Sequence, residues 1–375
     1  MDFTFNQDQM AFRDSLASML ADAVSSESIR ARWQTQSGFN RDTWQQLAEM
    51  GITGMLVPVA VGGMQMDEVD FVMLAEECGR VALPEPLVDI AQVSTRMLAE
   101  LVQANPAFAE QGNALLAQLA DGSALVIAGH MINPYQNFAS EADYFLLPHG
   151  EEVHLLSRDQ VSLTAHKSLD PSRRLARIEW TPAAETRIVD GQQGALLWRA
   201  ALNRGALGAA AQMLGLAQAM LAQTVQYSCD REQFGKAIGS NQAVKHLLAD
   251  CAVRIEFARP VVYRAAYTTS VEPQRADCAV SHAKTAAASA ALLCARHCTQ
   301  VHGAMGYTWE CDLHIWAKRS WALDKNWGDE GFHKNRIHEW LLNPRALFGA
   351  EYTFGASNTA FDLGLESGKP EEVCA

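Results

Sequence analysis

The sequence predicts an α+β fold that is mostly α, with an N-terminal helical domain, a small reduced β domain and a C-terminal helical bundle. Residues 1–120 and 191–350 place apolar side chains at helical spacing. Residues 121–190 instead hold short β-branched and aromatic runs between Pro and Gly turns. Because these strands do not alternate with helices, a doubly wound sheet is disfavoured. Residues 351–375 bear Gly, Ser and Glu and are expected to form a loose tail.

The composition limits the partners of the chain. Of its 375 residues, 49% are hydrophobic and 19% are charged, which is typical of a globular protein. The net charge is -13 and no dense Lys/Arg cluster occurs, so we expect no nucleic acid and no anionic membrane surface as main partner. The N-terminus lacks a basic region followed by an apolar one, and no run approaches about 18 continuous apolar residues. We therefore expect a cytoplasmic protein.

The helices of the first domain are predicted from periodicity and end signals. The first has its apolar residues near one face, and the second ends at Gly51, where glycine suits a C-terminal cap. These helices are expected at residues 9–21, 42–50, 68–79 and 86–120, the last broken at 105–106.

The strands and the later helices follow in order. Strand-like runs cover residues 125–128, 144–147, 153–156 and 177–180. The segment 206–223 is rich in Ala, Leu and Met with almost no charge, so it should be a buried helix. Further helices are expected at residues 242–258, 260–271, 276–302 and 337–342, with Pro260 separating the first two.

The eight cysteines indicate no disulfide framework, since they are scattered and form no CxxC pair. Cys294 and Cys298 lie four residues apart, with His297 and His302 close by. A metal could bind there, but a helix face with small buried cysteines is the more common explanation. No metal site is predicted.

Two segments carry chemistry suited to a phosphate-bearing ligand. Arg231 ends a predicted helix and a Phe-Gly turn follows, which leaves the guanidinium free to bind two phosphate oxygens. Gln242 begins the next helix and can offer its amide to a ligand. Gly303 and Gly306 let the backbone come close to a cofactor, because neither has a Cβ atom. The two segments are residues 227–250 and 300–310.

Together these segments resemble the acyl-CoA dehydrogenase family, whose members carry R-x-x-F-G, a following Q-x-x-x-x-x-L-A-D helix and a downstream Q-x-H-G-G-x-G motif. Residues 49–63 also look like the family's first domain. The resemblance implies a C-terminal four-helix bundle, a tetramer, FAD as cofactor and an acyl-CoA substrate. It assigns the adenosine-pyrophosphate half of an FAD, lodged mainly in a neighbouring subunit, to Arg231, Phe234, Gln242, Gln300 and Gly303.

The resemblance also indicates where the catalytic base should lie. Dehydrogenation needs a carboxylate to remove the α-proton while the flavin N5 accepts the β-hydride. The family's usual glutamate position falls on Trp327, and the alternative position, within residues 203–206, has no acid. Asp329 is the candidate catalytic residue, although a capping or turn role is the more common one for such an aspartate. Glu310 is the other nearby acid and is expected to begin a helix.

The β domain also departs from the family. It lacks the T-E-x-x-x-G-S-D-like and W-I-T-N-like segments that hold the flavin ring, whereas residues 169–174 resemble the end of the family's β domain. Two functions remain open. The chain is either a self-sufficient homotetrameric dehydrogenase with Asp329 as base, or a non-catalytic subunit of an α2β2 heteromer that lends FAD contacts to a second acyl-CoA dehydrogenase chain.

The resemblance favours the heteromer, because both glutamate positions and the flavin-ring segments are lost together. Degenerate subunits of this kind resemble the present chain and act with their partners on bulky acyl-CoAs, such as steroid side chains in lipid degradation. An electron-transfer acceptor is implied as a further partner.

Overall fold

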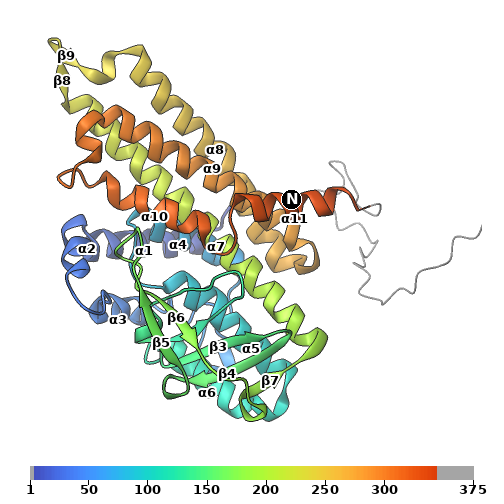
Figure 1. The fold of residues 1–375 in the computed structure, drawn as a ribbon. Helices are drawn as coiled ribbons and strands as arrows, with labels where there is room; N and C mark the ends of the chain where they lie inside the picture. Colours follow the sequence, from blue (N-terminus) through green and yellow to red (C-terminus); the bar gives the residue numbers. More distant parts are fainter. Residues whose placement is uncertain (1–3, 344–375) are drawn as a thin grey trace, which may run out of the picture.

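The computed structural model describes residues 4–343, and its N-terminal third is helical (Figure 1). Side-chain caps fix several helix starts, because Asn6, Ser25 and Asp67 each accept a hydrogen bond from a backbone amide of the first turn. The predicted helices are present, and α2 is an additional one. The elements are α1 (Gln7–Ala23), α2 (Ser26–Trp33), α3 (Arg41–Glu49), α4 (Glu68–Arg80), the π-helical η2 (Asp89–Ser94), α5 (Thr95–Ala104) and α6 (Ala109–Ala120).

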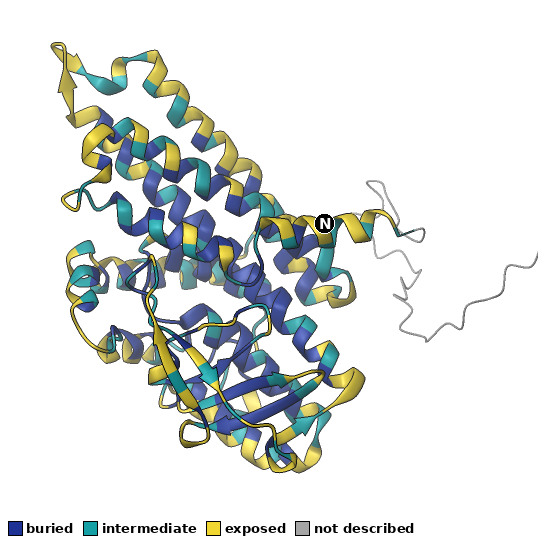
Figure 2. Ribbon diagram, viewed as in Figure 1, coloured by how far each residue is buried: buried dark blue, intermediate teal, exposed yellow. Residues whose placement is uncertain are grey.

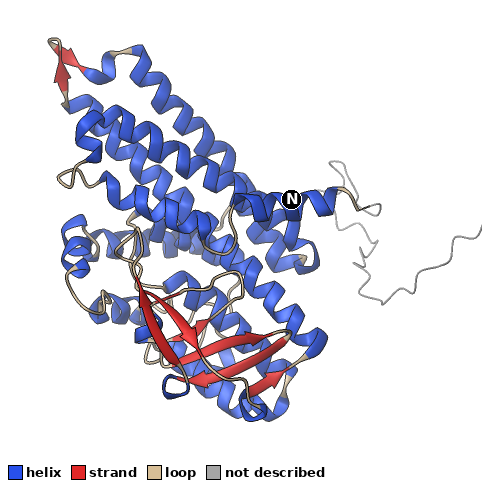
Figure 3. Cartoon of the chain, in the orientation of Figure 1, coloured by secondary structure: helices blue, strands red, loops and turns tan. Residues whose placement is uncertain are grey.

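Two small sheets follow, drawn in red in the lower part of Figure 3. The first has the order β1-β3-β4-β7, with β1 and β3 parallel and the other pairs antiparallel; the second has the order β2-β6-β5. The fully buried Phe138 and Phe145 belong to an apolar cluster with residues from both sheets. The strands are β1 (Val126–Ala128), β2 (Gln136–Asn137), β3 (Tyr144–His149), β4 (Glu152–Ser157), β5 (Ser162–His166), β6 (Leu175–Glu179) and β7 (Arg187–Val189).

The C-terminal half is a bundle of long helices. The central helix α7 runs from the sheets to the far tip of the bundle, and Figure 2 shows that α7 and α9 are mostly buried. Buried alanines line both helices, and a glycine of α7 packs on α4, since a Cβ atom on Gly215 would lie 1.9 Å from the carbonyl oxygen of Glu76. The helices are α7 (Gly191–Asp230), α8 (Gln242–Val271), α9 (Ala276–His302), α10 (Leu313–Lys325) and α11 (Glu330–Leu341). Helices α7 to α10 form the predicted bundle, so the fold class, α+β and mostly α, is confirmed.

Three sequence predictions are wrong in this half. Pro260 does not separate two helices but lies inside the continuous α8, because a proline removes only one hydrogen bond of a long helix. Helix α10 was not predicted. Helix α11 begins seven residues before the expected Ile337, because Asp329 caps it. The predicted tail, residues 351–375, lies outside the described residues.

Two stretches of the described chain are long and apolar enough, by length and composition alone, to cross a membrane. They are Gly191–Asp230 and Pro273–Tyr307, and 78% and 61% of their most apolar windows are buried inside the protein. Core helices of a packed bundle have the same property.

Candidate cofactor and active site

The five predicted FAD-binding residues lie at one end of the bundle. Helix α7 ends there, and a hairpin of β8 (Glu232–Gln233) and β9 (Lys236–Ala237) projects from the tip before α8 begins (Figure 1). The end of α9 reaches the same tip, because the ring of His302 stacks on Tyr227 with a centroid separation of 4.2 Å. The structure thus brings to one end Arg231, Phe234, Gln242, Gln300 and Gly303.

The hairpin presents an aromatic ring and a cation to its surroundings. Phe234 and Gly235 have φ values of 53° and 75°, the left-handed pair that a tight hairpin turn requires. The side chain of Phe234 is fully exposed, and Arg231 is exposed and makes no side-chain hydrogen bond or ion pair within residues 4–343. These groups can therefore bind a molecule that lies outside the body of their own chain.

The two glycines of the second segment play different roles. Gly303 ends α9 with a φ of 62°, and a Cβ atom there would meet nothing within 4 Å. A Cβ atom on Gly306 would lie 2.8 Å from the carbonyl oxygen of Thr299. The small size of Gly306 therefore serves a contact with α9, and its approach to a cofactor stays a prediction.

Trp327, at the predicted position of the base, is only 2% exposed. Its backbone N–H donates to Asn133 Oδ1 at 2.9 Å, and its indole Nε1–H donates to Asp89 Oδ1 at 2.9 Å. The ring of His130 lies 5.7 Å from the indole, between centroids. On another side the indole packs on Gly205 of α7, which lies in the family's alternative base position. The indole thus fills the space beside Gly205, between the two positions that the family resemblance assigns to a base.

The turn that carries Trp327 is held by buried hydrogen bonds. Trp327 has a φ of 57°, a conformation that costs a bulky residue about 1–3 kcal/mol. The Nζ of Lys284 donates to the carbonyl oxygens of Asp324, at 3.0 Å, and Gly328, at 2.8 Å. His333 Nε2–H donates to the carbonyl oxygen of Trp327 at 2.8 Å. Burial lowers the pKa of Lys284 to about 7 and the pKa of His333 to about 3.

A cavity of about 20 Å³ lies beside the indole, which is room for about one water molecule. Burial raises the pKa of Asp89, against the hydrogen bond from Trp327 and the charges of Arg173 and Arg319. Asp89 and Arg173 were not predicted as site residues, because the first lies in a helical pattern and the second in a turn. Besides Trp327, the polar residues around the cavity are Asp89, Asn133, Tyr135, Gln136, Asn137, Arg173 and Asn326.

The structure places Asp329 at a helix start. Its carboxylate accepts a hydrogen bond from the Phe332 amide at 3.0 Å, lies 3.6 Å from Lys325 Nζ and does not line the cavity. The Phe332 amide is the main reason why the pKa of Asp329 is lowered. The capping interpretation is confirmed, and the catalytic role stays a prediction. Glu310 is exposed and precedes α10, so the expectation that it begins a helix is wrong.

Comparisons with known proteins agree with these features. A model of the acyl-CoA dehydrogenase N-terminal domain matches residues 6–123, and a model of the C-terminal domain matches residues 192–342. Acyl-CoA dehydrogenase IpdE2 of Mycobacterium tuberculosis is 31% identical over 84% of this chain and 91% of its own length.

Solved structures share the fold. A chain from the ChsE4–ChsE5 complex of Mycobacterium tuberculosis superposes with a TM-score of 0.79 at 22% identity, over 92% of this chain and 99% of that chain. A chain of a Tcur3481–Tcur3483 steroid ACAD gives a TM-score of 0.74 at 21% identity, over 89% and 97%. The chain belongs to the acyl-CoA dehydrogenase family, oxidoreductases that act on acyl-CoA with FAD as cofactor.

Proposed function

We propose that this chain is the non-catalytic subunit of a two-chain acyl-CoA dehydrogenase, which removes hydrogen from the α and β carbons of an acyl-CoA. The observation that carries the proposal is the buried Trp327, which packs on Gly205 and fills the space of a base. An indole has no basic atom that could accept the α-proton. The base therefore belongs to a partner dehydrogenase chain.

The residues of this chain fit one half of FAD. At the tip of the bundle the free guanidinium of Arg231 would bind the pyrophosphate, since its fork matches two phosphate oxygens. Phe234, Gln242, Gln300 and Gly303 would contact the adenosine side of the same FAD, lodged mainly in the partner. The cavity of about 20 Å³ beside Trp327 is far too small for a flavin ring. When bound, FAD supplies the acceptor of the β-hydride, while this chain orients the adenosine-pyrophosphate half of the FAD.

Two of the similar structures support the assembly and the substrate class. One comes from the ChsE4–ChsE5 complex, and the other is described as a Tcur3481–Tcur3483 steroid ACAD. We infer an α2β2 heterotetramer that acts on a bulky acyl-CoA, such as a steroid side chain. The reduced flavin would pass its electrons to an electron-transfer acceptor.

The alternative is a self-sufficient homotetramer with Asp329 as base. Its support is the likeness to IpdE2 over most of both chains, because that relative is itself named an acyl-CoA dehydrogenase. In this alternative the turn of Trp327 would have to rearrange, because the Asp329 carboxylate caps α11.

The test is to purify the chain alone and after co-expression with a full-length acyl-CoA dehydrogenase that has both the glutamate and the complete β domain. FAD per chain, subunit mass and acyl-CoA oxidation are measured for each preparation. We expect little FAD in the chain alone and stoichiometric FAD in the complex. A Glu→Gln change in the partner should abolish oxidation. A yellow, active homotetramer of this chain alone would overturn the proposal.

A further inference from the structure

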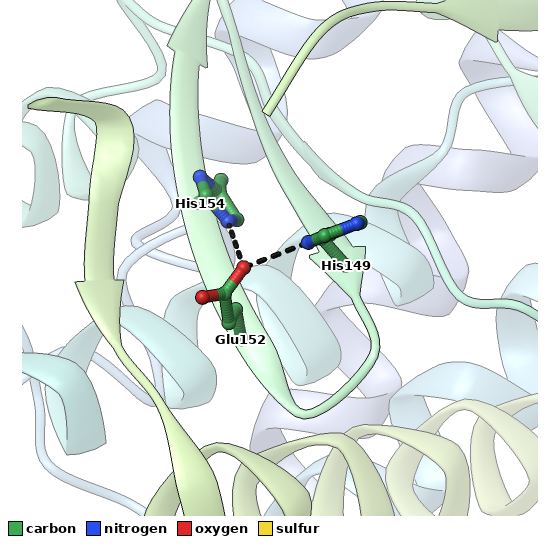
Figure 4. A group of neighbouring side chains, drawn as sticks. All are labelled: His149, Glu152 and His154. Carbon is green, nitrogen blue, oxygen red and sulfur yellow. Dashed lines mark hydrogen bonds and ion pairs between the residues drawn. The ribbon is translucent and has the colours of Figure 1, made fainter. Parts of the chain in front are cut away.

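The β3–β4 hairpin gathers two histidines and a carboxylate away from Trp327 and the bundle tip. His149 at the end of β3 is paired with Glu152 at the start of β4, and His154 follows two residues later on the same face of the strand. Glu152 Oε2 lies 2.8 Å from His149 Nδ1 and 3.1 Å from His154 Nε2 (Figure 4). The three atoms that these side chains could offer to a metal ion all lie within 4.8 Å of one another.

The hydrogen bonds of the Thr186 hydroxyl show that Nδ1 of His154 carries a proton. The hydroxyl of Thr186 donates its one proton to the carbonyl oxygen of Ala183 at 3.0 Å. His154 Nδ1, at 2.9 Å from the same hydroxyl oxygen, must then be the donor in that contact. On the opposite side of the ring, Nε2 faces Glu152 Oε2 at 3.1 Å, so a cation between these two atoms, either a proton or a metal ion, would hold them together.

Neighbouring side chains also position the Glu152 carboxylate and the His154 ring. Arg187 Nη1 donates to Glu152 Oε1 at 2.9 Å, which leaves Oε2 directed at the two rings. Trp198 Nε1–H donates to the carbonyl oxygen of Glu152 at 3.0 Å, and the ring of Trp180 lies 5.0 Å from the His154 ring. Metal ligands in proteins are oriented by outer partners of this kind.

We propose that His149, Glu152 and His154 bind one divalent transition-metal ion of the Zn²⁺ class, with water completing its coordination. Bonds of about 2.0–2.2 Å in a tetrahedron separate neighbouring ligand atoms by about 3.3 Å. The observed separations of 2.8 and 3.1 Å need only small side-chain shifts to reach that value. Imidazole nitrogens with one carboxylate suit zinc, whereas calcium and magnesium bind oxygen ligands.

The two rings lie edge to face, with their planes inclined by 74° and 6.2 Å between centroids. The side chain of His149 is 61% exposed, so an ion can enter from solvent, while that of His154 is buried. The site was not predicted from residue spacing, because only the hairpin register places His149 opposite Glu152.

The position of the cluster indicates a structural role. Strand β4 pairs with β7 through a register irregularity at Val153 and His154; Thr186 directly precedes β7, and Arg187 is its first residue. An ion on the three ligands would cross-link β3 and β4 beside the irregular pairing of β4 with β7. It would stabilise the β region without taking part in redox chemistry.

The test uses the full-length chain without a histidine tag, treated with a chelator and then dialysed against limiting Zn²⁺. Bound zinc per chain and the melting temperature are measured for the wild type, His149→Ala and Glu152→Gln. His166→Ala, which removes an exposed histidine of β5, is the matched control. We expect one zinc per wild-type and control chain, a zinc-dependent rise in melting temperature, and binding at least about tenfold weaker in the other two variants.

Co²⁺ in place of Zn²⁺ gives a second readout, because a four-coordinate cobalt site with nitrogen ligands has visible absorption bands. We expect the bands in the wild type and in His166→Ala, and their loss in His149→Ala and Glu152→Gln. Equal zinc content in all four proteins, or no zinc above background in the wild type, would show that the cluster is a hydrogen-bonded network only. Either result overturns the proposal.

Discussion

Gly205 and Trp327 share one space: a Cβ atom on Gly205 would lie 2.2 Å from the indole carbons Cδ2 and Cε2. By resemblance to the family, both lie where a catalytic glutamate is placed. The largest side chain at one position thus needs the smallest residue at the other. Because the two fill the same volume, a carboxylate could be introduced at residue 205 only by replacing Trp327 as well.

Gly205→Ala should destabilise the chain by about 1–3 kcal/mol, because the added methyl group has no room in a packed core. The loss should appear even though alanine favours a helix over glycine by about 1 kcal/mol. Urea unfolding at constant pH measures the difference in the free energy of unfolding.

Gly331→Ala in α11 is the matched control, because a Cβ atom there would lie 3.4 Å from Asp329 Oδ1, an ordinary contact. It should be neutral or stabilising. Adding Trp327→Leu to Gly205→Ala should cost less than the sum of the two single changes, because the smaller side chain relieves the overlap. A Gly205→Ala protein as stable as the wild type would contradict the packing described here.

Mild acid should destabilise the turn of Trp327 through His333. Burial lowers the pKa of His333 to about 3 from an ordinary 6.5, so the folded ring stays neutral in that interval while the unfolded ring takes up a proton. The free energy of unfolding therefore falls as the pH falls below 6.5. Between about pH 7.5 and pH 5 the contribution reaches up to about 2 kcal/mol.

The His333→Gln variant lacks this titrating group, so the unfolding free energy of the variant should depend less on pH than that of the wild type. His130 and His314 also have pKa values lowered to about 4 by burial, but both proteins contain them and their effects cancel in the difference. Urea titrations at several pH values give the two curves. Parallel curves would show that His333 is not buried in its neutral form.

Local patterns were sufficient for much of the bundle. The bounds of α9 were predicted because its alanines and cysteines repeat at helical spacing over 27 residues. Helix α10 was missed because its buried face carries charge: Arg319 is paired with Asp170 and donates to the Leu83 carbonyl oxygen at 2.7 Å. A charge that is neutralised only by distant partners hides the apolar stripe in the sequence.

The same distinction applies to the site. Turn chemistry around Arg231 and Phe234 is local, so the turn could be predicted from the Phe-Gly pair, although the two short strands beside it were not. The hydrogen bonds that hold Trp327 in place are accepted by Asn133 and Asp89, which are 194 and 238 residues away in sequence. No local pattern contains these contacts. The placement of Trp327 at the family's base position could be predicted by resemblance, but the cavity and its polar lining could not.

Arg231→Ala should weaken FAD retention in the complex with its partner. A charge-assisted contact to pyrophosphate contributes about 1.5–3 kcal/mol, or about one to two decades in affinity. Flavin per complex after extensive dialysis is the measurement. Arg254→Ala, which removes an exposed arginine from α8, is the control and should retain the flavin. Equal flavin content in both variants would show that Arg231 does not contact the cofactor.

Substitutions at Asp329 separate a cap from a base. Asparagine caps helices about as well as aspartate, so Asp329→Asn should change stability little, whereas Asp329→Ala should lose about 1 kcal/mol. If the base lies in the partner chain, acyl-CoA oxidation by the complex should be unchanged in both variants. Unfolding by urea and oxidation by the assembled complex are measured side by side.

We expect the capping result because the geometry opposes a catalytic one. The Asp329 carboxylate already accepts the Phe332 amide, and this hydrogen bond holds its pKa below the ordinary value, which makes it a weaker base. Trp327, whose indole is fixed by Asp89, lines the cavity, whereas Asp329 does not. A complex with Asp329→Asn that keeps its FAD and its assembly but no longer oxidises acyl-CoA would show that this chain is the catalytic subunit, and that the turn of Trp327 opens during turnover.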